Sequence, residues 1–163
     1  MKALYSKLNA MHAALRAIPK FVKLDDSGNA ITNDATSHAA VLIPHAGIIV
    51  WPHSLGNGNE THASAETLCR DLRAMGYADW RLASRDDWVH ILDLTRSDPA
   101  IDAAMFPGVK PRWHWTSTLC AWSKNAAGVA SAAWYVYAYD GYVAHYGRGS
   151  YDGFALAVRS AGQ

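Results

Sequence analysis

Residues 134–146 have the sequence Trp-Tyr-Val-Tyr-Ala-Tyr-Asp-Gly-Tyr-Val-Ala-His-Tyr, in which two alternating segments flank an Asp-Gly pair. An Asp-Gly pair in this setting is the strongest short-range signal for a β-hairpin, and it favours a two-residue type I′ turn. Such a turn places Tyr139 opposite Tyr142 and Tyr135 opposite Tyr146 on neighbouring strands. The segment therefore predicts an antiparallel hairpin near the C-terminal end of the chain.

The two faces of this hairpin differ in chemistry, because successive side chains of a strand point to opposite sides. One face carries five tyrosines, and the other is mainly apolar and is predicted to face the core. We interpret the tyrosine face as a recognition surface, since tyrosine offers rigid contact area at low entropic cost. The alternative, that loops cover these rings, stays open. The tyrosines are Tyr135, Tyr137, Tyr139, Tyr142 and Tyr146, and the opposite face consists of Trp134, Val136, Ala138, Val143 and His145.

The composition is that of one globular domain. The chain has 163 residues, of which half are hydrophobic and 18% are charged, and its formal net charge is +1. These values argue against disorder and against nucleic acid as a partner. The N-terminal residues lack the apolar run of a signal peptide, and no stretch is apolar enough to span a bilayer. We therefore expect a soluble protein without a membrane partner, in which Cys69 and Cys120 are reduced, buried thiols.

The order of predicted elements is helices early and strands late, which favours an α+β fold. Apolar residues at helical spacing predict a helix over 3–17, and two further helices are predicted over 63–75 and 85–94. Residues 1–38 are predicted to form a helical and strand-turn extension, and residues 39–163 are predicted to form the main domain, the two together making one compact unit. Predicted strands lie at 21–24, 39–43, 47–51, 113–119, 133–139, 142–146 and 154–159.

Several segments in residues 40–159 resemble a known family when they are taken together. They are Gly-Tyr-Ala-Asp-Trp-Arg-Leu at 76–82, Trp-Thr-Ser-Thr at 115–118, Ala-Trp-Tyr-Val at 133–136 and Phe-Ala-Leu-Ala-Val-Arg at 154–159. This order resembles the Lcl C-terminal domain family, which is related to C-type lectin-like and formylglycine-generating-enzyme-like folds. The resemblance implies a C-type lectin-like fold, with two helices packed on twisted antiparallel strands, that recognises a glycan or a protein. The N-terminal lead-in resembles that of some phage and prophage-encoded members.

Two arginines in the most recognisable segments are predicted to be structural. Arg81 and Arg159 each offer five donors, which could pair with a carboxylate such as Asp79, Asp86 or Asp87. Three tryptophans are also assigned structural roles. They are Trp80, Trp115 and Trp134.

The sequence contains no recognisable catalytic or metal-binding pattern. It has no His-Glu-x-x-His motif, no histidine pair at ligand spacing and none of the tripeptides with which lectins bind calcium and sugar. Ser117 has no identifiable base, and neither cysteine lies in a reactive motif. We therefore expect no enzyme activity, no cofactor and no metal. An enzyme with an unrecognised site, using Asp86 and Asp87 in a closed pocket, is the alternative.

We expect a recognition module that binds a host protein or a glycan through the tyrosine face and the loop 147–153. Arg148 would supply a charged anchor, and Tyr151 and Trp122 would add aromatic contacts. A phage-encoded inhibitor of a host protein, acting in the host cytoplasm, is one version of this hypothesis, and a virion-associated receptor-binding component is another. A structural homo-oligomer that buries the tyrosine face is a further alternative.

Overall fold

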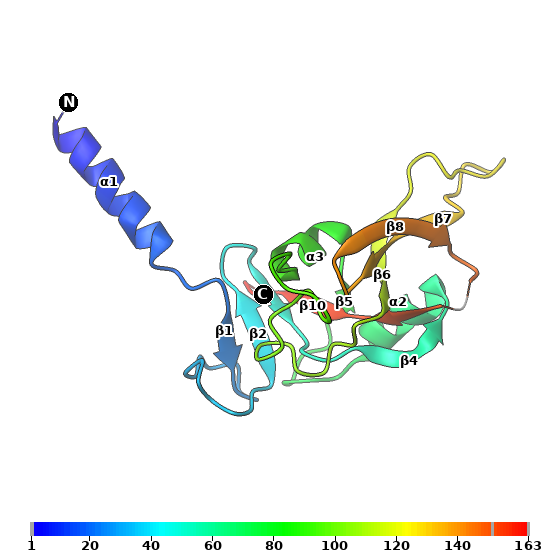
Figure 1. Ribbon diagram of the computed structural model, residues 1–163, viewed down its shortest axis with the longest axis horizontal. Coiled ribbons are helices and arrows are strands. Elements are labelled where there is room, and N and C mark those ends of the chain that lie inside the picture. Colours follow the sequence, from blue (N-terminus) through cyan, green and yellow to red (C-terminus); the bar gives the residue numbers. More distant parts are fainter. Residues whose placement is uncertain (1, 151, 163) are drawn as a thin grey trace.

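The computed structural model describes residues 2–150 and 152–162 (Figure 1). Its helices are α1 (Lys2–Arg16), α2 (His62–Asp71) and α3 (Arg85–Ile91). Its strands are β1 (Val22–Leu24), β2 (Ala40–Ile43), β3 (Ile48–Val50), β4 (Leu55–Glu60), β5 (Arg81–Leu82), β6 (Trp113–Leu119), β7 (Ala132–Tyr137), β8 (Tyr142–Gly147), β9 (Gly153–Ala155) and β10 (Ala157–Ser160).

The strands form two five-stranded sheets. The first has the order β1-β2-β3-β10-β5, and the second has the order β4-β9-β6-β7-β8. Neighbouring strands are antiparallel except β6 and β9. Leu156 separates β9 from β10, so the chain passes there from one sheet to the other. This mixture of helices and largely antiparallel sheets confirms the predicted α+β class.

The hairpin at 134–146 forms as β7 and β8, but its predicted register is wrong by two residues. Tyr137, not Tyr139, lies opposite Tyr142, and the connection has four residues instead of two. The backbone explains the difference, because Ala138 and Tyr139 hydrogen-bond to Arg112 and to the 98–100 segment. A shift of two residues keeps every strand side chain on its predicted face, since the side-chain period of a strand is two.

Two buried clusters of apolar side chains stabilise the fold. One gathers around Trp88 and Phe106 and includes Val136 and Ala138 from the hairpin. The other gathers around Trp80 and Trp115. Trp88 and Trp115 are both fully buried, and burying side chains of this size is the main source of stability in such a domain.

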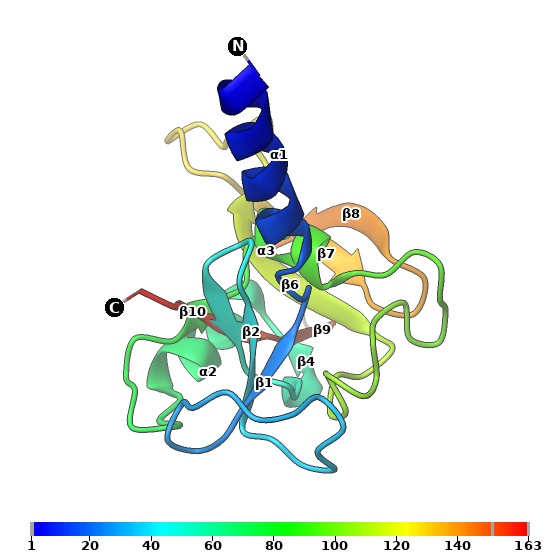
Figure 2. The same ribbon diagram turned by 90° about the vertical axis from the view of Figure 1, so that its left-hand side faces the viewer.

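The N-terminal extension has two parts that behave differently. Strand β1 pairs with β2, and Phe21 and Leu24 are buried, so residues 21–24 pack into the first sheet. Helix α1 has no buried residue among those described and stands away from the sheets in Figure 1, and in Figure 2 its N-terminal part extends beyond them. Among the described residues, no helix has the length and apolar character needed to cross a membrane.

Helix α3 begins with a capping box formed by Ser84 and Asp87. The Asp87 N–H donates to Ser84 Oγ at 3.0 Å, and the Ser84 N–H donates to Asp87 Oδ2 at 2.7 Å. Ser84→Ala removes the first of these bonds from a seven-residue helix, so we expect the free energy of unfolding to fall by about 1 kcal/mol in urea denaturation. Ser27→Ala in an exposed turn is the control, and an equal loss in both variants would contradict the capping role.

Candidate functional site

Six aromatic side chains lie on one face of β6, β7 and β8 and in the turn that follows β7, and we call them the aromatic strip. Tyr139, Tyr142 and Tyr146 are 40%, 61% and 46% exposed. Tyr137 and Trp113 are half-buried. Tyr135 is only 3% exposed and packs beneath the rings of Trp113 and Tyr146. The strip consists of Trp113, Tyr135, Tyr137, Tyr139, Tyr142 and Tyr146.

Five of the six rings of the strip are stacked into a continuous row, and Tyr142 makes an edge contact with Trp113. The ring centroids of Trp113 and Tyr135 are 4.1 Å apart with planes at 8°, and those of Trp113 and Tyr137 are 4.8 Å apart at 27°. Tyr146 extends the row beyond Tyr135, and Tyr139 extends it beyond Tyr137. Because each ring is held by its neighbours, little side-chain entropy is lost when a ligand binds to the row.

A groove of about 580 Å³ adjoins the strip and is lined in part by Trp113 and Tyr137. Its other lining residues combine both signs of charge with an amide. They are Asn57, Gly58, Lys110, Pro111, Arg112, Asp152 and Phe154. Another pocket, of about 610 Å³, is lined by the 33–38 loop with Lys23 and His53 and contains no tyrosine or tryptophan. The groove therefore brings aromatic faces and polar groups together, as ligand sites require.

Two glycines make the close packing around the groove possible. A Cβ at Gly58 would lie 2.8 Å from the Phe154 ring, and the φ of Gly58 is +90°. A Cβ at Gly153 would lie 2.9 Å from the Trp115 ring. A larger residue at either position would force the loops apart.

Asp152 connects the groove to the base of the strip. The Tyr135 hydroxyl donates to Asp152 Oδ2 and to its carbonyl oxygen, both at 3.1 Å. Burial, together with the nearby Asp152 carboxylate, raises the pKa of Tyr135 well above its usual range. Tyr135 therefore stays protonated and positions Asp152 at the groove.

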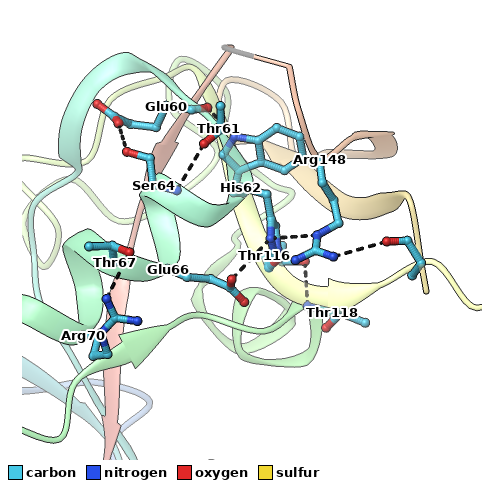
Figure 3. Close-up of polar contacts among 12 residues, drawn as sticks. Glu60, Thr61, His62, Ser64, Glu66, Thr67, Arg70, Thr116, Thr118 and Arg148 are labelled. Carbon is cyan, nitrogen blue, oxygen red and sulfur yellow. Dashed lines mark hydrogen bonds and ion pairs between the residues drawn. The ribbon is translucent and has the colours of Figure 1, made fainter. Parts of the chain in front are cut away.

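Arg148, the expected charged anchor, points to His62 at the start of α2 (Figure 3). It is half-buried, its Nε donates to His62 Nδ1 at 3.2 Å, and its Nη1 donates to the Ala130 carbonyl at 3.2 Å. His62 Nε2 donates in turn to the Thr116 carbonyl at 2.9 Å. Burial lowers the pKa of His62, and Arg148 lowers it further although Glu66 opposes the shift.

Arg148 thus joins the 147–150 segment to α2, and the charges at the groove come from Lys110, Arg112 and Asp152. Tyr151 lies outside the described residues.

Trp122 lies on the opposite side of the hairpin from the strip. Its exposed ring makes edge contacts with Trp134 at 5.3 Å and with His145 at 5.4 Å between centroids. The guanidinium of Arg85 lies 4.5 Å from the centre of the Trp134 ring. The structure therefore does not bring Trp122 together with the tyrosines. Trp134, on the face of β7 that was predicted to face the core, is half-buried.

Both predicted structural arginines have carboxylate partners. Arg159 Nε and Nη2 donate to the two oxygens of Asp79 at 2.8 and 3.0 Å. Arg81 Nη1 donates to Asp87 Oδ2 at 2.6 Å. Burial acts to raise the pKa of Asp87, but the bonds from Arg81 and Ser84 outweigh it, so this pKa lies below its usual range. Trp80 and Trp115 are buried, as their assigned roles require.

A serine–histidine contact is the nearest approach to catalytic geometry, and sequence reasoning missed it because its members are sixty residues apart. His114 Nδ1 donates to the Arg112 carbonyl at 2.9 Å, so Nε2 accepts from Ser54 Oγ at 2.7 Å. Ser54 Oγ also accepts from the Lys110 N–H at 2.9 Å. Burial lowers the pKa of His114 to about 4, which makes it a poor base at neutral pH. We interpret this contact as a bridge that holds the loop beside the groove.

The two cysteines have thiols that are not activated as nucleophiles. Cys69 and Cys120 are buried and unpaired with each other. Burial raises the pKa of both thiols, that of Cys69 to about 12, so neither is a ready nucleophile. Residues 2–150 and 152–162 contain no cluster of three His, Cys, Asp or Glu side chains able to hold a metal ion.

Comparisons with known proteins agree with the sequence resemblance at the level of the family. A comparison with curated proteins finds no match. The family model described as the Lcl C-terminal domain matches residues 40–159, which include both five-stranded sheets except β1 and the end of β10. Because this match extends over well more than half of the sequence, the chain belongs to the Lcl C-terminal domain family.

Proposed function

We propose that this protein is a non-enzymatic recognition module of C-type lectin-like fold that binds an extended glycan along the aromatic strip and the adjoining groove. The observation that carries the proposal is the shared position of Trp113 and Tyr137, which belong to the stacked row and also line the groove. A sugar ring has an apolar C–H face and a polar rim. The aromatic rings would contact the C–H face of the sugar, and the polar lining of the groove would hydrogen-bond to its hydroxyl rim.

The polar lining provides the donors and acceptors that such a ligand needs. Lys110 and Arg112 offer donors, Asp152 offers acceptors, and Asn57 offers both. The strip and the groove are held in place before any ligand binds, because Tyr135 is buried and bonded to Asp152. Such preorganisation favours binding without a large conformational change.

A protein partner is the second candidate, and the exposed end of the strip favours it. Tyr139, Tyr142 and Tyr146 present ring area outside the groove, and exposed tyrosines are enriched at protein interfaces. A host protein bound and inhibited by a phage-encoded chain, or a receptor bound by a virion component, would be a partner of this kind.

Trp113→Ala tests the proposal after an array of natural glycans has identified the best-bound sugar. We expect the dissociation constant of that sugar to rise about tenfold or more in calorimetry, because an aromatic wall of the groove is lost. Trp122→Ala is the matched control, since it removes an exposed tryptophan on the opposite side of the hairpin. Thermal unfolding of each variant establishes that it is folded.

Tyr142→Ala separates the two candidates. Tyr142 is 61% exposed and does not line the groove, so its loss should raise the dissociation constant of the glycan much less than Trp113→Ala does. The same loss should clearly weaken binding of a protein that covers the exposed end of the strip. No binding to any glycan on the array, or equal losses in the Trp113 and Trp122 variants, would overturn the glycan proposal.

A further inference from the structure

The pocket of about 610 Å³ lies where the chain before residue 40 meets the rest of the domain, and we call it the lysine pocket. It is lined by Lys23 of β1, the loop 33–38, His53, Ala104 and Pro107. It shares no lining residue with the groove beside the aromatic strip. Most of its lining precedes the segment that matches the family model, so this pocket is not a family feature.

Lys23 is the unusual member of the lining, because a lysine is seldom buried unless an acidic group pairs with it. The residue is only 4% exposed. Its Nζ donates to the Ala35 carbonyl at 2.6 Å, and no described carboxylate is in ion-pair contact with it. An ammonium group has three donors. One neutral acceptor therefore leaves the Lys23 charge without a directly bonded counter-ion at the pocket.

The backbone of Lys23 is fixed on both sides, which holds its side chain at the pocket. On one side β1 pairs with β2, and Lys23 lies opposite Val41. On the other side the Lys23 N–H donates to Asn33 Oδ1 at 3.2 Å, and its carbonyl accepts from the Ile31 N–H at 2.9 Å. Asn33 Nδ2 donates to the Phe21 carbonyl at 3.0 Å, so the loop is tied to β1. Such a preorganised cation binds a ligand with little loss of entropy.

Further cationic groups surround the same pocket. His38 Nε2 donates to the Met105 carbonyl at 2.7 Å, which joins the end of the loop to the 104–107 turn. Burial lowers the pKa of His53, and the charges of His38 and Lys110 lower it further. These groups are therefore close enough to repel one another when they are protonated. A bound anion would relieve this repulsion.

Asp34 is the acidic residue of the lining and opposes an anion. A hydrogen bond from Thr32 lowers its pKa, and the charge of Lys23 lowers it further, so Asp34 is ionised at neutral pH. Asp34 is exposed, however, and water and salt screen its charge. The charge of the buried Lys23 is screened less. The balance of charge thus favours an anion at the Lys23 end of the pocket.

We propose that the lysine pocket binds a small ligand through an oxyanion, a carboxylate or a phosphate group, with Lys23 as its buried counter-ion. The Lys23 ammonium would donate charge-assisted hydrogen bonds, which are about twice as strong as neutral ones. The hydroxyls of Thr36 and Ser37 line the same pocket and offer further donors. This site is separate from the aromatic strip and the groove, so it does not depend on the proposed glycan binding.

Titration of the ¹⁵N-labelled protein with inorganic phosphate, and separately with malonate, tests the proposal at pH 7 and constant ionic strength. We expect saturable NMR shifts of the backbone amides of residues 33–38, and the tighter probe identifies the class of anion. Lys23→Met keeps the aliphatic stem and removes the charge, so the dissociation constant should rise at least about tenfold. Lys124→Met removes an exposed lysine outside the pocket and is the matched control.

Asp34→Asn provides a second test that does not alter a buried group. Loss of the opposing carboxylate should lower the dissociation constant of the same anion about threefold. A role of Lys23 in folding alone predicts no such gain, and this variant decides the matter if Lys23→Met does not fold.

Three results would overturn the proposal. They are the absence of saturable shifts in the wild type, an unchanged dissociation constant in a folded Lys23→Met variant, and no gain in Asp34→Asn. Saturable shifts confined to residues 110–112 would place the anion at the cations of the groove and would also overturn it.

Discussion

Arg159→Ala is expected to lower the free energy of unfolding by about 3 kcal/mol, because it removes a buried guanidinium and its bonds to Asp79 from the first sheet. Arg159 is 2% exposed on β10, between β3 and β5, and it holds both oxygens of Asp79. Its guanidinium also lies 3.7 Å from the centre of the Tyr77 ring. The substitution removes two charge-assisted hydrogen bonds, a cation–π contact and buried packing at once, and urea denaturation measures the loss.

Arg81→Ala is the matched control for this experiment. Arg81 lies on the neighbouring strand β5 and also pairs with an aspartate, but its side chain is 45% exposed. We expect a loss of about 1 kcal/mol, since water reaches the Arg81 guanidinium and little buried packing is lost with it. Arg159→Lys should recover only part of the stability, because an ammonium group cannot bind both oxygens in the same fork geometry. Equal losses for the two alanine variants would contradict the structural role assigned to Arg159.

Local patterns predicted the elements and the tyrosine face well because the relevant physics is local. The Asp-Gly pair specified a hairpin, and alternation specified which side chains share a face. The register could not be predicted, because it depends on hydrogen bonds from Ala138 and Tyr139 to segments that lie elsewhere in the sequence. Strand β4 was likewise missed, since Gly56, Asn57 and Gly58 are typical turn residues and form a strand here only by pairing with β9.

The candidate site was predicted in part for the same reason. Alternation identified the tyrosines of the strip, but Trp113 joins them through the pairing of β6 with β7, which no local pattern encodes. Arg148 was assigned to the surface from its neighbours in sequence, yet the fold brings it to His62, 86 residues away. The direction and exposure of a charged side chain in a loop depend on contacts with residues that are distant in the sequence. The sequence alone therefore could not show which charged groups line the groove.

The free energy of unfolding is expected to fall by about 3 kcal/mol between pH 7 and pH 4 because of His114 alone. Burial lowers the pKa of this fully buried imidazole to about 4, against an ordinary value of 6.5. Between these two values the unfolded chain binds a proton that the folded protein does not bind. Stability is therefore full above pH 6.5 and declines as the pH falls toward 4. Urea denaturation at a series of pH values measures this slope.

His114→Gln isolates the contribution of this residue, because glutamine does not titrate in this range. The variant should be less stable than the wild type at pH 7, where the bonds to Ser54 and Arg112 are disturbed, but its stability should change much less between pH 6.5 and pH 4. A shallower slope in the same direction should remain, since burial also lowers the pKa of His62. His90→Gln on the exposed side of α3 is the control and should keep the full slope. If His114→Gln also keeps the full slope, the acid sensitivity arises elsewhere, and the neutral, bridging form of His114 beside the groove is refuted.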